Sequence, residues 1–318
     1  MSASMSRGYA AVLLIAFGGP GSREEIRPFL ARVLKGVAVS SERLEEVARH
    51  YEAVGGRSPL VDITLRQAAA LEQRLAQEGS PLRVYVGMRN SRPFIAEALK
   101  QMIDDGVGRA LGVILSSFRT EASWERYVEN VADARLAAGA AAPVIDYCNP
   151  WHDHPGFVET WVERIRAELS RVPAAEKSAT PLVFTAHSVP LAMAAGSPYV
   201  EQFHAAARLI AERLPHPFWR AAYQSRSGRP GDPWLEPDVN QTIGELAADG
   251  WRRVIVAPIG FVSEHVEVLY DLDLEARATA ERLGLAFLRA GCPNDHPEFV
   301  RMLADVIEQK LKTAEGRR

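Results

Sequence analysis

Short apolar runs alternate with amphipathic segments along the whole chain. The apolar runs cover residues 12–17, 83–88, 112–118, 142–147, 181–188, 219–225, 254–261 and 285–291. Apolar runs of this length without a polar alternation are typical of strands that are buried on both faces of a parallel sheet. The segments between them, such as 65–78 and 94–106, repeat apolar residues with the period of a helix. The pattern predicts an α/β protein built from two units, each with a four-stranded parallel sheet flanked by helices.

The periodicity is interrupted once, at Pro150 and the polar segment WHDHPG that follows it. We therefore expect an N-terminal half over residues 1–148 and a C-terminal half over residues 149–296. The final amphipathic segment, 297–318, is expected to form a helix that packs back on the first half.

The apolar run at residues 10–19 follows Arg7 and so imitates a signal peptide. The glycine-rich turn after it leads into an amphipathic helix rather than a cleavage site. Ser22 is the expected N-cap of that helix, with Glu25 as its capping-box partner. The run is therefore interpreted as a buried first strand.

Composition and charge argue against several classes of function. The net charge is -3 and the 37 Lys and Arg residues are scattered, so no basic stripe for a nucleic acid is present. The two cysteines, Cys148 and Cys292, are too few for a zinc knuckle or a disulfide framework, which favours a reducing compartment. No apolar stretch is long enough to span a bilayer. We expect a cytoplasmic protein that does not bind nucleic acid.

The stretch PIGFVSEHVEVLYDLDLE, residues 258–275, runs from a strand end into an acidic helix. At about 100° per residue, four carboxylates next to His265 fall within an arc of roughly 80°: Glu264, Glu267, Asp271 and Glu275. Parallel sheets place ligand sites at the carboxyl ends of their strands, which makes this face a candidate site. A solvated acidic face near a helix N-terminus would show the same spacing.

His187 is the second candidate, at the carboxyl end of the run 181–188, where Pro190 fixes the following turn. The acidic helix also follows a strand of the second half, so both would lie at one edge of the same sheet. A histidine with a purely structural hydrogen bond would fit the same position.

Three loops carry unusual residues. The loop AFGGPGS (16–22) matches neither a dinucleotide nor a Walker A motif and is best interpreted as a tight turn. The loop YEAVGGRSPL (51–60) offers backbone donors and the Arg57 guanidinium, which suit a carboxylate. The loop YQSRSGRPGDPWLEPD (223–238) is either a binding loop or a rigid surface loop held by Trp234.

Six motifs occur along the chain in this order: LLIAFGGP, HYEAVGGRSPL, VGMRNSRPFI, TAHSVP, YQSRSG followed by PWLEPD, and PIGFVSEHVEVLYDLD. In these motifs the chain resembles the ferrochelatase family over nearly its whole length. The resemblance implies two Rossmann-like domains facing each other across a porphyrin cleft, and an enzyme that inserts ferrous iron into a porphyrin in haem biosynthesis. His187 and Glu267 match the catalytic histidine and glutamate of the family, which handle the pyrrole protons and the incoming metal. Asp271 and Glu275 match its acidic metal path.

The resemblance also assigns porphyrin binding to a set of residues from both halves: Phe17, Tyr51, Arg57, Ser58, Arg89, Ser188 and Trp234. Two positions depart from metal-ligating residues found in some members, since Phe17 replaces a tyrosine and Asn90 replaces a histidine or tyrosine. We therefore expect no strong metal ligand opposite His187. Whether His187 accepts a pyrrole proton or holds the incoming metal stays open.

The resemblance further implies that iron is a substrate and that no cofactor is tightly bound. No iron–sulfur cluster is expected from two cysteines. We expect a monomer without a spanning segment and leave a transient contact with a membrane surface open. The PWLEPD loop and Phe17-Gly18-Gly19 resemble members that use coproporphyrin III rather than protoporphyrin IX. Two alternatives are a chelatase for another metal and tetrapyrrole, and a porphyrin or haem carrier without catalysis.

Overall fold

The computed structural model describes residues 8–36, 40–214, 216–227 and 231–315, which contain two parallel sheets. The first sheet has the order β2-β1-β3-β4, formed by β1 (Ala11–Ala16), β2 (Arg83–Met88), β3 (Arg109–Ile114) and β4 (Val144–Tyr147). The second has the order β6-β5-β7-β8, formed by β5 (Leu182–His187), β6 (Trp219–Gln224), β7 (Arg253–Ala257) and β8 (Ala286–Arg289). The predicted fold class is confirmed, and the two sheets repeat one strand order.

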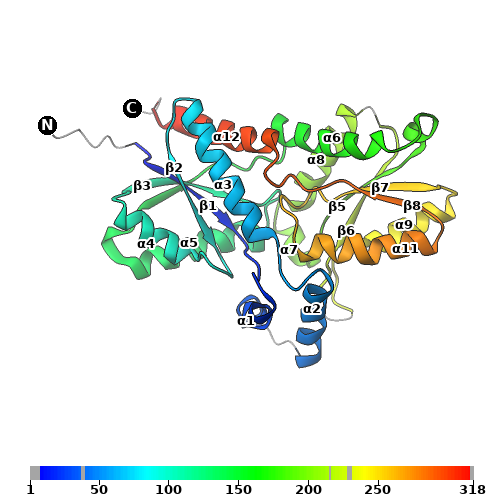
Figure 1. Ribbon diagram of the computed structural model, residues 1–318, viewed down its shortest axis with the longest axis horizontal. Coiled ribbons are helices and arrows are strands. Elements are labelled where there is room, and N and C mark those ends of the chain that lie inside the picture. The colour runs from blue at the N-terminus through cyan, green and yellow to red at the C-terminus, as the bar shows by residue number, and fades with distance from the viewer. Residues whose placement is uncertain (1–7, 37–39, 215, 228–230, 316–318) are drawn as a thin grey trace.

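Helices cover both faces of each sheet (Figure 1). In the first half they are α3 (Leu60–Gln77), α4 (Ile95–Asp104) and α5 (Arg126–Ala138), and this half also contains α1 (Arg23–Val33) and α2 (Ser41–Ala53). In the second they are α6 (Pro155–Ser170), α7 (Leu191–Ala195), α8 (Tyr199–Arg213), α9 (Val239–Ala248), α10 (Val266–Leu269) and α11 (Arg277–Arg282), followed by α12 (Pro297–Glu315). In the part of the chain described, no helix is both long enough and apolar enough to cross a membrane.

The alternation of side chains along β1 explains why the first sheet needs two helical layers. All six residues of β1 are buried. Val12 and Leu14 join an apolar cluster with α3, α6 and α12, while Leu13 and Ile15 join another with α4 and α5. A strand with apolar residues on both faces is stable only when both faces are covered.

The cluster on the α3 side continues without a break into the second half. It contains residues of β1 and β5 as well as Phe299 and Leu303 of α12. The last helix contacts both α3 and α6, so it spans the two sheets rather than covering only the first. The division at residue 148 remains our proposal for the domain boundary, because one core joins the two halves.

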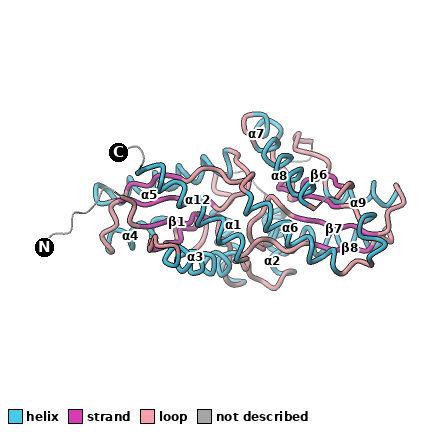
Figure 2. Tube along the Cα trace, turned by 90° about the horizontal axis from the view of Figure 1, so that it is seen from above, coloured by secondary structure: helices cyan, strands magenta, loops and turns pink. Residues whose placement is uncertain are grey.

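Helices α1 and α2 pack on each other and lie outside the helical layers, near the middle of the long axis (Figures 1 and 2). They follow the carboxyl end of β1. The turn that leads to α1 contains Gly18 with φ +90°, a conformation that glycine adopts without strain. A Cβ atom at Gly18 would lie 2.4 Å from Ser91 Oγ, so this turn also needs a residue without a side chain.

Some sequence-based details were wrong. Ser22 is at the N-cap position of α1, but its hydroxyl donates to Glu24 instead of capping the helix. Glu25 accepts a hydrogen bond from the Gly21 amide, so the predicted capping box is absent. The third strand ends at Ile114 and not at Phe118, and β7 ends at Ala257 because the following proline has no amide hydrogen to extend the ladder.

Candidate functional site

The strand order identifies where a ligand site should lie in the second sheet. After β5 the chain passes to β6 on one side and then to β7 on the other, so the crevice between the carboxyl ends of β5 and β7 is the topological switch point. His187 is the last residue of β5, and the loop after β7 leads to α10. Gly260 in that loop allows the close approach, since a Cβ there would lie 2.7 Å from Ala186 Cα.

His187 lies at this point with its ring 30% exposed. Its Nε2 atom is 3.6 Å from Oε1 of Glu267, and its Nδ1 atom contacts the carbonyl oxygen of Ser188. The hydroxyl of Tyr199 donates to the His187 carbonyl oxygen at 2.8 Å and fixes the end of the strand. Burial alone would lower the pKa of His187, but the Glu267 carboxylate outweighs it and holds this pKa above its ordinary value.

Glu267 is in the first turn of α10 and contacts two histidines. Its Oε2 atom is 3.3 Å from Nε2 of His265, while Oε1 faces His187. Its backbone oxygen accepts from Nε2 of Gln224 at 2.8 Å, which ties α10 to the end of β6. Burial would raise the pKa of Glu267, but His187 and then His265 more than offset it, so this pKa lies well below its usual range. Glu267 therefore stays anionic at neutral pH.

Beyond Glu267 the chain forms a π-helical segment, Asp271–Ala276, that carries two more acidic residues. The amide of Glu275 donates to the carbonyl oxygen of Tyr270, five residues earlier, at 3.1 Å. Burial raises the pKa of Asp271 to about 7, although the hydroxyl of Ser225 donates to its carboxylate. Burial, followed by Asp238 and Glu46, also raises the pKa of Glu275. Both carboxyls therefore lie where negative charge is costly.

Glu264 does not belong to this acidic line, which corrects the sequence-based interpretation. The helix begins only at Val266, so the assumed rotation of 100° per residue does not reach back to Glu264. Its Oε1 atom instead accepts from Arg289 at 3.0 Å and from the Cys292 amide at 2.9 Å. Three of the four predicted carboxylates remain in the line: Glu267, Asp271 and Glu275.

The first half contributes aromatic and basic residues near the same carboxylate. Tyr51 is buried on α2, and burial together with Glu267 raises the pKa of its hydroxyl. Burial also raises the pKa of Tyr127, with Glu267 as a smaller cause, and the Arg89 guanidinium lies 5.9 Å from the Tyr127 ring centre. Glu267 thus acts electrostatically on tyrosines of the first half.

Two contacts join α1 and α2 of the first half directly to the carboxylate helix, which comprises α10 and the π-helical segment after it, residues 266–276. Val266 belongs to the apolar cluster formed by these helices, which includes Phe29 and, half-buried, Phe17. The rings of His50 and Tyr270 stack at a centroid distance of 3.8 Å. The site is therefore assembled from both halves.

Other predicted binding residues are engaged by their own loops. Arg57 is exposed and pairs with Asp62. Ser58 is buried against Gly19, and its hydroxyl accepts from the Leu60 amide at 3.3 Å. These contacts hold the loop after α2, and the role of both side chains in binding a porphyrin stays a prediction.

The hydroxyl of Ser188 donates to the carbonyl oxygen of Leu235 at 2.9 Å. Trp234, next to it, is half-buried and forms an isolated backbone bridge with Pro190. These contacts hold the loop against the turn after β5. Residues 228–230 of the predicted loop 223–238 lie outside the described residues.

Sequence reasoning missed three residues that shape the site. Gln224 and Ser225 lie in the motif YQSRSG, where a loop role seemed as plausible as a site role, yet they contact Glu267 and Asp271. Ser225 has φ 62°, a left-handed conformation that is uncommon for serine and marks a constrained position. Tyr199 begins a helix after a proline and carried no sequence signal, because its partner is a backbone oxygen.

The described residues contain no group of three or more His, Cys, Asp or Glu side chains arranged to hold a metal ion. The Glu267 carboxylate contacts both His187 and His265. A metal that enters here would have to separate existing pairs and complete its coordination with other ligands.

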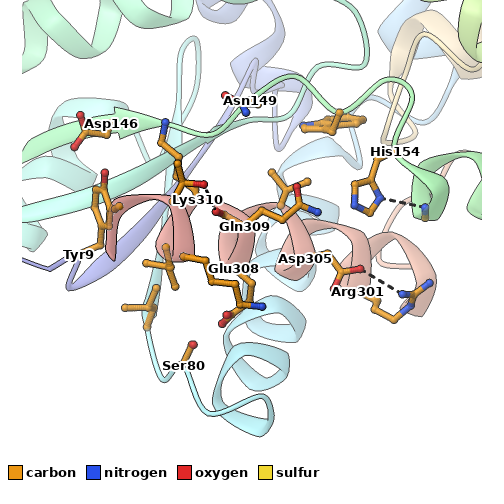
Figure 3. A pocket seen from close by; sticks show the side chains of 18 of the residues that line it. Tyr9, Ser80, Asp146, Asn149, His154, Arg301, Asp305, Glu308, Gln309 and Lys310 are labelled. Atoms are coloured by element: carbon orange, nitrogen blue, oxygen red, sulfur yellow. Dashed lines mark hydrogen bonds and ion pairs between the residues drawn. The ribbon is translucent and has the colours of Figure 1, made fainter. Parts of the chain in front are cut away.

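A separate cavity of about 1510 Å³ lies at the opposite edge of the first sheet (Figure 3). Its walls come from the chain before β1, the segment 149–156 and α12, and include Tyr9, His154 and Lys310. It lies by the amino-terminal ends of β1 and β3, whereas Phe17 and Arg89 follow carboxyl ends. None of the described residues that line it was predicted for the site.

The comparisons with known proteins agree over nearly the whole chain. The family model Ferrochelatase matches residues 9–311. A coproporphyrin III ferrochelatase from Mycobacterium leprae is 43% identical over 304 residues, covering 95% of this chain and 89% of that protein. One from Mycolicibacterium smegmatis is 40% identical over 313 residues, covering 98% and 92%. A ferrochelatase from Rhodopirellula baltica is 38% identical over 304 residues, covering 95% and 86%.

Solved structures give the same result for the fold. SirB from Bacillus subtilis with Fe3+ superposes with a TM-score of 0.60 at 15% identity, covering 96% of this chain and 97% of that one. The sirohydrochlorin chelatase SirB in complex with cobalt has a TM-score of 0.58 at 12% identity, with the same coverage. At this identity the likeness concerns the fold alone. The family match and the identity to the mycobacterial proteins show that this chain is a member of the ferrochelatase family.

Proposed function

We propose that this protein inserts ferrous iron into a porphyrin in haem biosynthesis, and that His187 and Glu267 carry out the reaction. The observation that supports this most is the pair itself. Its two side chains come from different segments, approach to 3.6 Å at the switch point between β5 and β7, and shift each other's pKa in opposite directions. A proton acceptor held beside a permanent anion is what metal insertion into a tetrapyrrole requires.

The reaction exchanges two pyrrole protons for one dication. Pyrrole N–H groups are very weak acids, so an acceptor has to lie close to the nitrogen while the metal arrives. Neutral His187 accepts one pyrrole proton, and Glu267 stabilises the imidazolium that forms. The approaching dication repels that imidazolium, and His187, whose side chain is 30% exposed, releases the proton to solvent water. Neutral His187 then accepts the second pyrrole proton and releases it in the same way. The pair therefore couples loss of protons to entry of the metal.

The acidic line supplies a route for the cation. Carboxylates and water are suitable weak ligands for a hydrated dication, and Asp271 and Glu275 succeed Glu267 along the π-helical segment. The lack of a three-ligand group among the described residues supports transfer rather than storage. We propose that iron passes Glu275 and Asp271 before it reaches the His187–Glu267 pair.

The pKa of Asp271 makes this route testable. Since burial raises this pKa to about 7, the carboxylate is charged above pH 7 and becomes neutral as the pH falls through that value. The KM for ferrous iron should therefore rise between pH 8 and pH 6 in the unmodified enzyme. Asp271→Asn should have a several-fold higher KM at pH 8, and a much smaller dependence on pH, in anaerobic initial-rate measurements.

A matched control for this variant is Asp249→Asn, which removes a carboxylate from the C-terminal end of α9 in the same half. Its KM for iron should equal that of the unmodified enzyme at both pH values. An Asp271→Asn enzyme with an unchanged dependence on iron concentration would contradict the proposed route.

We propose coproporphyrin III as the preferred substrate over protoporphyrin IX. The support is the name of the mycobacterial relatives, at 40–43% identity, and the likeness of Phe17-Gly18-Gly19 and the PWLEPD loop to members with that substrate. Competition between the two porphyrins for limiting enzyme should give a kcat/KM ratio that favours coproporphyrin III at least several-fold. A ratio below one would assign the enzyme to protoporphyrin IX instead.

We further propose a cytoplasmic monomer without a resident cofactor, for which iron is only a substrate. Both cysteines are buried free thiols, which suits a reducing compartment and leaves no ligand set for an iron–sulfur cluster. A transient contact with a membrane surface is also part of the proposal. Sedimentation of the purified protein tests whether it is a monomer. Its recovery with vesicles, compared with its recovery without them, tests the contact with a membrane surface.

A further inference from the structure

Arg289 lies at the end of β8. Its guanidinium binds one acidic residue before Glu267 and one after it. Its side chain is 12% exposed. Its Nε and Nη2 atoms donate to the two oxygens of Asp273 at 2.7 Å each, and Nη1 donates to Oε1 of Glu264 at 3.0 Å. Glu264 precedes α10, and Asp273 lies in the π-helical segment that follows it. One guanidinium thus binds both flanks of the segment that carries Glu267.

Glu264 is itself fixed by two backbone contacts. Its Oε1 atom also accepts from the Cys292 amide at 2.9 Å, and its own amide donates to Oδ1 of Asn294 at 2.9 Å. Asn294 has φ 50°, and its carbonyl oxygen accepts from Nε2 of Gln67, a buried residue of α3, at 2.8 Å. The anchor of the carboxylate helix therefore extends to the first half.

Glu267 lies in the first turn of a longer helical segment, since α10 continues through the π-helical residues Asp271–Ala276 into α11. The first turn of a helix has amide groups without partners inside the helix, so its position depends on contacts with the surrounding chain. The Glu267 side chain must nevertheless stay between His187 and His265 at 3.6 and 3.3 Å. The rigidity of the surrounding anchors is the physical basis for that geometry.

We propose that Arg289 is a positioning residue for iron insertion, which holds Glu267 against His187 by bridging Glu264 and Asp273. The inference rests on the proposed function. Arg289 does not touch the reacting atoms; it acts through the backbone of α10. Its bidentate contact with Asp273 and its single contact with Glu264 require a planar guanidinium, so lysine cannot reproduce both.

The test replaces Arg289 by glutamine and by lysine and measures kcat, KM for iron and the Kd for porphyrin. A shift of Glu267 by a fraction of its contact distance should lower kcat about 10- to 100-fold in Arg289→Gln. The Kd for porphyrin should stay within about twofold, because Arg289 lies behind the helix. Arg289→Lys should recover only part of kcat, since lysine keeps the charge but loses one bridge.

Arg220 provides a matched control within the same half. It also pairs with two carboxylates, Glu245 at 3.0 Å and Asp249 at 2.6 Å, but it ties β6 to α9 and leaves α10 untouched. Arg220→Gln should have an unchanged kcat, whatever its effect on thermal stability. If Arg289→Gln does not fold, the double variant Arg289→Gln with Asp273→Asn is used in its place. It removes the cation together with one buried anion.

The inference is overturned by kcat within twofold of the unmodified enzyme in Arg289→Gln or in the double variant. It is also overturned if kcat and porphyrin affinity fall together, which indicates general loss of structure. Absence of iron insertion by the unmodified protein would instead reject the proposed function, so the two failures are distinguishable.

Discussion

Replacing His187 by alanine is expected to lower iron insertion by about 10²- to 10⁴-fold while porphyrin binding persists. The range is that of a positioned proton acceptor. The backbone of His187 is held by groups other than its own side chain, since Tyr199 donates to its carbonyl oxygen at 2.8 Å and the residue pairs with Gln224 of β6. The strand end should therefore keep its position in the variant. The measurements are the initial rate of loss of free porphyrin and the quenching of porphyrin fluorescence on binding.

His204→Ala is a suitable control for this experiment. His204 lies on α8 in the same half and is half-buried against Phe203, away from the carboxylate helix. It should insert iron at the rate of the unmodified enzyme. A His187→Ala enzyme with normal turnover would remove His187 from the mechanism.

Glu267→Gln should produce the second largest effect, a loss in kcat of about 10²-fold or more. Glutamine keeps the volume and one acceptor oxygen but removes the negative charge that stabilises protonated His187. Because burial alone lowers the pKa of His187 and Glu267 opposes it, the pKa of His187 should fall in this variant. The rate of insertion and the titration of His187 by nuclear magnetic resonance measure the two effects separately.

The control for charge removal is Glu245→Gln, a carboxylate on α9 that pairs with Arg220 on the surface. Neither kcat nor the titration of His187 should change in it. A Glu267→Gln enzyme that keeps its rate would show that the anion is dispensable, even if the pKa of His187 moves.

The fold could be predicted because its signal is repeated along the chain. Continuous apolar runs such as β1 and β5 require cover on both faces, and helical segments of sufficient length lie between them. Strand ends were less accurate, as at Phe118 and Phe261, because apolar residues also occur in the turns that follow a strand. Hydrophobicity reports burial, and a buried turn gives the same signal as a buried strand.

The site could be predicted only where it depends on strand ends. His187 ends β5 and Glu267 follows β7, and parallel topology brings those strand ends together. The exclusion of Glu264 could not be foreseen, since the late start of α10 depends on the distant residues Arg289 and Asn294. Hydrogen bonds between residues far apart in sequence leave no periodic pattern.

The most direct test of the proposed function is anaerobic incubation of the purified protein with ferrous iron and coproporphyrin III. The measured quantity is the absorbance of the free-porphyrin bands over time. We expect loss of these bands over many turnovers, with an iron porphyrin as product. Tight binding of porphyrin without turnover would contradict the proposed function and indicate a carrier. Turnover only with cobalt or nickel would also contradict it, and would assign the site to another metal.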